Sequence, residues 1–136
     1  MYIGSDWSLE FLQNLIENQV QESIDLEYKN SLALNKKDRC KDEISKDVSA
    51  FANSAGGVII YGIEEQKHVP VKIDDGVDPN EISKEWLEQV ISSRIQRKID
   101  NIRIHQIPIN DSNVAYVVEI PQSSRAPHQA KCRAPN

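Results

Sequence analysis

The chain has 136 residues, a formal net charge of −5 and 39% hydrophobic residues, which suits one domain with its own core. No apolar run approaches the roughly 20 residues of a membrane-spanning helix, and the first residues lack the basic and apolar regions of a signal peptide. Cys40 and Cys132 have no neighbouring cysteine, so we expect two reduced thiols. These features predict a cytoplasmic protein without membrane association.

Helical spacing of apolar residues predicts a first helix from about Trp7 to residues 17–19, with Ser5 or Asp6 as its N-cap. A strand over residues 24–29 follows, in which successive side chains point to opposite faces. One face would carry Ile24, Leu26 and Tyr28, and the other Asp25, Glu27 and Lys29.

A second helix is predicted over residues 37–53, because Cys40, Ile44, Val48 and Phe51 recur at helical spacing. Gly56 and Gly57 would end it, since glycine readily adopts the left-handed cap conformation. The run GVIIYGIEE then predicts one central strand covered on both faces. Residues 69–73 would add an edge strand.

A third helix is predicted to begin at Asn80 or Glu81 and to carry its apolar stripe as far as Ile95. Residues 102–109 and 115–120 alternate as strands, and a turn at residues 111–113 joins them. The order α-β-α-β-α-β-β predicts an α/β (α+β) domain, a mixed sheet flanked by helices.

The charge is unevenly distributed along the chain. Residues 1–27 hold six acids and no lysine or arginine, whereas residues 121–136 hold Arg125, Lys131 and Arg133 and no acid. We expect one domain over residues 1–121 and a basic polar tail over residues 122–136, in a chain truncated from a longer protein.

Carboxylates gather around the first predicted strand, where stability alone gives no reason for them. Glu22, Asp25 and Glu27 precede Lys29 within eight residues. Divalent cations such as Mg²⁺ and Mn²⁺ take carboxylate oxygens together with phosphate and water, and a nearby ammonium can stabilise phosphate charge. The alternative is a solvated strand face with an ion pair.

A second acidic group follows the glycine-ended central strand. Glu64 and Glu65 come directly after Gly62 and Ile63, and ligand sites in open α/β sheets favour strand ends. One of these carboxylates could therefore join the first group. The alternative is a tight turn followed by a solvated acidic end.

Together the two elements resemble a known family. The first is an E-x4-E-x-K motif, and the second is the block AFANSAGG followed by YGIE. This combination resembles the AlbA-like DNA-binding family, the Schlafen-type domain formerly called a divergent AAA domain, in a bacterial member. The resemblance covers nearly the whole chain after about residue 17.

The resemblance implies a mixed-sheet domain that binds nucleic acid, often as the N-terminal module of a larger transcriptional regulator. In animal Schlafen proteins the domain is a metal-dependent RNA endonuclease with an acidic triad. Carried over, that triad would be Glu22, Glu27 and either Glu64 or Glu65, and the corresponding metal ligands would be Glu22, Glu27 and Glu65 for Mg or Mn. Lys29 would assist catalysis.

Several basic residues are candidates for contact with nucleic acid, mainly with its backbone. They are Lys29, Arg94, Arg97, Lys98, Arg125, His128 and Lys131. Schlafen enzymes join two lobes around RNA, so a one-lobed chain would need a homodimer to clamp it. The chain lacks G-x-x-x-x-G-K-[ST], so no ATP site is expected.

Of three functions that the sequence allows, it favours the first, and the other two are alternatives. The first is a nucleic-acid-binding domain that contacts DNA or RNA through its backbone. The second is a Mg- or Mn-dependent endoribonuclease of Schlafen type. The third is a protein-interaction or oligomerisation domain without a nucleic-acid role.

Overall fold

The computed structural model describes residues 2–124 and 126–131 as an α/β domain built around one mixed sheet. The sheet order is β1-β2-β7-β6, with β1 over Leu26–Lys29, β2 over Gly56–Tyr61, β7 over Val114–Pro121 and β6 over Arg103–Pro108. β1 runs parallel to β2, and the other neighbours are antiparallel. The predicted fold class and the order of its main elements are confirmed.

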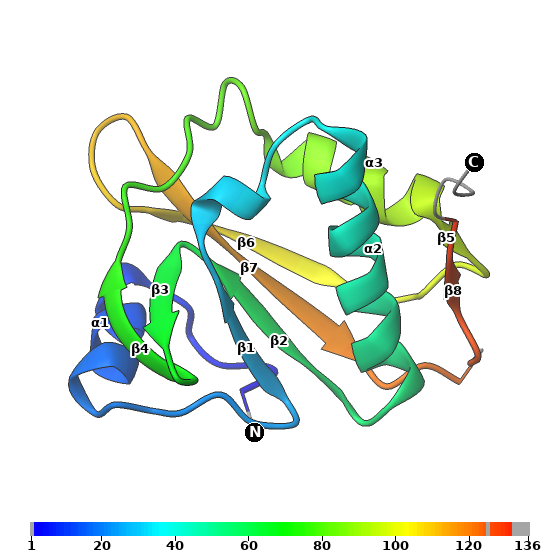
Figure 1. Ribbon diagram of the computed structural model, residues 1–136, viewed down its shortest axis with the longest axis horizontal. Coiled ribbons are helices and arrows are strands. Elements are labelled where there is room, and N and C mark those ends of the chain that lie inside the picture. The colour runs from blue at the N-terminus through cyan, green and yellow to red at the C-terminus, as the bar shows by residue number, and fades with distance from the viewer. Residues whose placement is uncertain (1, 125, 132–136) are drawn as a thin grey trace.

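Helices cover the sheet on both faces (Figure 1). Helices α2 (Asp38–Asn53) and α3 (Lys84–Arg94) pack on one face, where Ile59 and Val118 point. Helix α1 (Leu9–Glu17) covers the other face, where Val58 and Val117 point. Neighbouring residues of β2 and β7 thus supply two separate cores, which explains why both strands are mostly apolar, with Glu119 of β7 the one charged residue in them.

Two helix starts differ from the predictions. Helix α1 begins after Ser8, whose hydroxyl accepts a hydrogen bond from the Phe11 N–H, rather than after Ser5 or Asp6. Helix α3 begins after Ser83, whose hydroxyl accepts from the Trp86 N–H, rather than at Asn80 or Glu81. In both places the serine one turn further on provides the side-chain oxygen that the free backbone N–H groups require.

The predicted single strand GVIIYGIEE is wrong, because Gly62 divides it. Gly62 has φ +129°, and a Cβ there would lie 2.7 Å from the Cβ of Ala115. The chain leaves the main sheet at this point and forms an antiparallel hairpin from β3 (Ile63–Gln66) and β4 (Val69–Ile73). The hairpin packs beside α1 (Figure 1).

The strand predicted over residues 24–29 is shorter than expected. Ile24 is 79% exposed, and residue 23 instead closes a small bridge with Leu26. Within β1 the predicted alternation is confirmed, because Leu26 and Tyr28 are buried whereas Glu27 and Lys29 are partly exposed. The two charged residues face α2.

The segment after Pro121 contains a strand that the sequence did not indicate. β8 (Gln129–Ala130) pairs with β5 (Ile95–Gln96). The Asn53 side chain secures this segment: its amide donates to the His128 carbonyl, and its oxygen accepts from the His128 N–H. The last residues, 132–136, and Arg125 lie outside the described residues.

We expect Gly56→Ala to destabilise the fold strongly. Gly56 has φ +81°, and an added Cβ would lie 2.7 Å from the Ile120 carbonyl oxygen. Left-handed strain and the steric clash should together cost about 2–4 kcal/mol. Gly4→Ala is the matched control, since Gly4 also has positive φ but nothing within 4 Å of the added Cβ; it should cost about 1 kcal/mol. Urea unfolding measures both, and equal losses would contradict the close approach at Gly56.

Candidate functional site

The acidic residues of the two motifs line one pocket beside β1, where the β3–β4 hairpin approaches this strand. One pocket of about 540 Å³ is lined there by Glu22, Glu27, Lys29, Glu64 and Glu65. His68, from the turn of the hairpin, lines the same pocket. The structure therefore brings together all five residues that the sequence suggested for catalysis.

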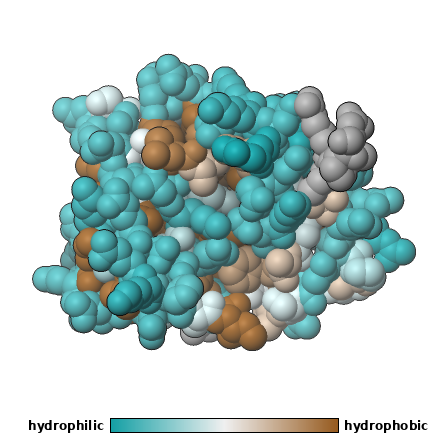
Figure 2. All heavy atoms as spheres, in the orientation of Figure 1, coloured by the Kyte–Doolittle hydropathy of each residue, from teal (hydrophilic) through white to brown (hydrophobic). Residues whose placement is uncertain are grey.

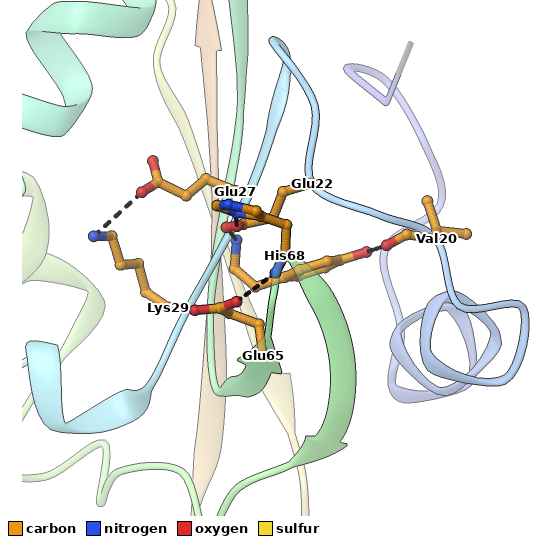
Figure 3. Close-up of polar contacts among 7 residues, drawn as sticks. Val20, Glu22, Glu27, Lys29, Glu65 and His68 are labelled. Carbon is orange, nitrogen blue, oxygen red and sulfur yellow. Dashed lines mark hydrogen bonds and ion pairs between the residues drawn. The ribbon is translucent and has the colours of Figure 1, made fainter.

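Glu22 is held in place from two sides. Its Oε2 accepts a hydrogen bond of 2.8 Å from the Tyr28 N–H on the unpaired edge of β1. Its own N–H donates to the His68 carbonyl at 2.7 Å. Only 15% of its side chain is exposed. The Tyr28 ring is buried, and its hydroxyl donates to the Val20 carbonyl (Figure 3).

Glu65 and His68 complete a group of ligand atoms around Glu22. One such atom from each residue lies within 4.8 Å of the other two. The Glu22 Oε1 is 2.8 Å from the His68 Nδ1, and the Glu65 Oε2 accepts from the His68 N–H. Hydrogen bonding to Glu22, and then its charge, raises the pKa of His68. Two carboxylates and an imidazole at this separation suit a divalent cation.

The two hairpin glutamates have different surroundings. The register of β3 and β4 shifts between Glu64 and Glu65, and such a bulge redirects the side chains on either side of it. The Glu64 carboxylate lies 3.9 Å from the Lys72 ammonium, whereas Glu65 joins Glu22 and His68. Of the two possible third acids, Glu65 is therefore the better placed for a cation.

Glu27, expected as a metal ligand, points to the other side of β1. Its carboxylate lies 3.2 Å from the Lys29 Nζ (Figure 3). That ammonium is also 3.5 Å from Asp47 of α2. Glu27 is not part of the group formed by Glu22, Glu65 and His68. Glu27 still lines the same pocket and can reach a ligand there. The structure therefore separates the ligand group of Glu22, Glu65 and His68 from the two ion pairs that Lys29 makes with Glu27 and Asp47.

Lys29 and Asp47 each affect the pKa of the other. Burial alone would lower the pKa of Lys29, but Asp47 and Glu27 more than offset it, so the pKa is raised. Burial raises the pKa of Asp47 to about 6, with Glu27 and Glu43 adding repulsion and Lys29 opposing the rise. Lys29 therefore stays charged at the pocket wall near neutral pH.

Sequence reasoning missed Asp47 and His68. Asp47 lies three residues after Ile44 and four before Phe51, so helical spacing places it at the border of the apolar stripe of its helix. His68 had no such signal. Its role depends on a two-residue hairpin turn, and the sequence there, Lys67-His68, is not a typical turn pair.

The basic candidates lie away from this pocket. Arg94 is bound to Asp38 at 2.9 Å and to Asp42 at 2.5 Å. His128 is 4% exposed and its ring contacts Ser123 and the Arg97 carbonyl, so it packs the interior in this conformation. The side chains of Arg97, Lys98 and Lys131 are exposed. They directly follow β5 and β8 in the sequence, and these two strands lie at the opposite end of the domain from the hairpin (Figure 1).

Hydrophobic residues form small, separate areas on the face shown in Figure 2. Among the described residues, the large hydrophobic side chains that are exposed are Ile3, Ile24, Leu32 and Val71. A broad apolar patch, which a protein-interaction domain would present, is not seen on this face. No helix in the described parts of the chain is long and apolar enough to cross a membrane.

The chain is therefore a mixed-sheet α/β domain with an acidic pocket between its edge strand and the neighbouring hairpin. The family Schlafen, AlbA_2 matches residues 22–134, and the chain belongs to this family. The match includes all the pocket residues named above.

Two solved structures share the fold. The N-terminal domain of a Nitrosomonas europaea protein, named for its relation to the ATP-dependent DNA helicase RecG, is 20% identical with a TM-score of 0.63, over 92% of this chain and 80% of that one. The DIP2311 protein of Corynebacterium diphtheriae is 16% identical with a TM-score of 0.59, over 93% of this chain. The match spans only 29% of the DIP2311 chain. No curated protein matches the chain.

We expect Asp47→Asn to remove a pH-dependent loss of stability. The pKa of Asp47 is raised to about 6 in the folded state, so the folded protein holds this proton more tightly than the unfolded chain. The wild type should therefore lose stability as the pH rises from about 4 to above 6. The loss should be roughly 1–2 kcal/mol, since about 1.4 kcal/mol accompanies each pKa unit and solvent screens part of the effect.

Denaturant unfolding at pH 4 and pH 7 measures this difference. Relative to wild type, Asp47→Asn should gain stability between the two pH values. Asp111→Asn, on an exposed turn, should follow the wild type. A constant difference between wild type and Asp47→Asn would contradict the raised pKa.

Proposed function

We propose that this domain binds nucleic acid through its phosphate backbone, with a divalent cation held in the pocket by Glu22, Glu65 and His68. The observation that carries the proposal is this ligand group, whose donor atoms lie within 4.8 Å of one another beside Lys29. The family match and the helicase-related name of one structural neighbour support a nucleic-acid role.

Electrostatics explain why a cation would be required. The pocket carries the carboxylates of Glu22, Glu27, Glu64 and Glu65, and the whole chain has a net charge of −5. Phosphate would be repelled from such a surface. What a divalent cation supplies when bound is charge neutralisation and polarisation of a phosphate oxygen.

The exposed basic residues suit a second contact with the nucleic-acid backbone. Arg97, Lys98 and Lys131 lie at the far end of the domain (Figure 1) and can meet a longer backbone that also reaches the pocket. Such contacts position a nucleic acid without reading its sequence and weaken with salt. A homodimer would double both surfaces.

Cleavage of the bound strand is the second candidate function, as in a metal-dependent endonuclease. The observation that favours it is the position of the Lys29 ammonium, which lines the pocket between Glu27 and Asp47. A cationic group fixed beside a bound phosphate can stabilise the charge that develops on it during hydrolysis. Glu27, which also lines the pocket, can accept a proton from an attacking water.

Gel shifts with single-stranded RNA and duplex DNA test the binding proposal. Wild type should bind in Mn²⁺ and lose about tenfold or more in affinity when EDTA removes the cation. The double variant Glu22→Gln, Glu65→Gln should behave in Mn²⁺ as wild type does in EDTA, because it lacks both carboxylate ligands. Glu17→Gln, which removes one exposed carboxylate outside the pocket, should match wild type. Binding that ignores both EDTA and the double variant would refute the proposal.

A cleavage assay with the same nucleic acids in Mn²⁺ or Mg²⁺ tests the second candidate. Lys29→Met keeps the apolar stem but removes the ammonium, so cleavage should fall roughly a hundredfold while the gel shift persists. Lys72→Met is the control, since Lys72 is an exposed hairpin lysine beside Glu64. If the wild-type protein binds nucleic acid but does not cleave it, the second candidate function is wrong and the domain only binds.

A further inference from the structure

The turn of the β3–β4 hairpin places an imidazole against two carboxylates. The His68 Nδ1 is 2.8 Å from the Glu22 Oε1, and both residues form one ligand group with Glu65. About 74% of the His68 side chain is exposed, so an ion from solvent can reach it. The group is therefore not purely acidic, because it offers a nitrogen donor as well as oxygen donors (Figure 3).

The main chain of His68 fixes this arrangement independently of its ring. Its N–H donates to the Glu65 carboxylate at 2.8 Å, and its carbonyl accepts from the Glu22 N–H at 2.7 Å. Residue 68 is thus the only described residue bonded through its backbone to both acids of the group. The ring adds a ligand to a site that the backbone already assembles.

Both residues of the turn have left-handed backbone conformations. Lys67 has φ 51° and His68 has φ 70°, and they connect the paired residues Gln66 and Val69. Two-residue turns of this kind favour asparagine and glycine, which tolerate positive φ. Asparagine can therefore replace either residue without disturbing the turn, which provides a variant and its matched control.

The donor set discriminates between cations. Mg²⁺ takes oxygen ligands almost exclusively and retains several waters. Imidazole nitrogen favours first-row transition cations, and carboxylates accept Mn²⁺ as readily as Mg²⁺. Two carboxylates alone would show little preference, so any selectivity must come from the histidine.

We propose that His68 makes this site selective for a first-row transition cation, Mn²⁺ being the one best suited to its carboxylates, over Mg²⁺. This inference rests on the proposed function, since it concerns the cation held by Glu22 and Glu65. In this proposal His68 is the ligand that determines which cation binds. A simple ion pair between His68 and Glu22 would give no such preference.

The test is direct cation binding to the full chain without nucleic acid. Electron paramagnetic resonance of free Mn²⁺ measures its affinity, and competition with Mg²⁺ gives the preference. Wild type should prefer Mn²⁺ by about tenfold or more. His68→Asn should lose about tenfold in Mn²⁺ affinity, with Mg²⁺ affinity changed less than about threefold. Lys67→Asn, at the other left-handed position, should match wild type.

Three results would overturn the inference. The first is a wild-type preference for Mn²⁺ near one, which decides the matter even if His68→Asn does not fold. The second is a Mn²⁺ affinity that is unchanged in folded His68→Asn. In both cases the gel shift of the double variant at Glu22 and Glu65 still tests the proposed function separately. The third is no cation binding to wild type, which would overturn the proposed cation as well.

Discussion

The bond from the Tyr28 backbone N–H to the Glu22 carboxylate is the interaction on which the candidate site depends. β1 lies at the edge of the sheet, so its outer N–H groups have no neighbouring strand to bond. One of them holds Glu22 at 2.8 Å. Tyr28 also buries its ring in the core, and its hydroxyl holds the preceding loop by donating to the Val20 carbonyl. An unpaired strand edge, usually a liability, here positions a carboxylate.

Two groups of functional side chains lie on different sides of β1, one along its outer edge and the other on its helical face. Glu22 lies along the outer edge of β1 with the hairpin residues Glu65 and His68. Lys29 points to the helical face, where Asp47 and Glu27 hold it. Both groups border one pocket, to which each contributes a different property. The first offers ligands to a cation, and the second offers a fixed positive charge to an anion.

Residue patterns predicted the parts of this site that depend on local periodicity. Alternation along β1 correctly placed Glu27 and Lys29 on one face, and the glycine-ended strand correctly led to acids near that edge. The break at Gly62 was not predicted, because an apolar run cannot show where a chain leaves its sheet. His68 reaches Glu22 across 46 residues of sequence through a turn of unusual composition. Long-range contacts of this kind follow from the register of the hairpin, which no local pattern specifies.

The measurement that tests the account most directly is an amide NMR titration of the chain with Mn²⁺, followed by a short RNA strand. Paramagnetic broadening should first affect the amides of Tyr28, Glu65 and His68, which lie at the ligand group. RNA should then shift resonances around Lys29. Broadening that begins instead beside another acidic pair, such as Asp38 and Asp42 on α2, would contradict a cation site at the hairpin and with it the proposed route to nucleic acid.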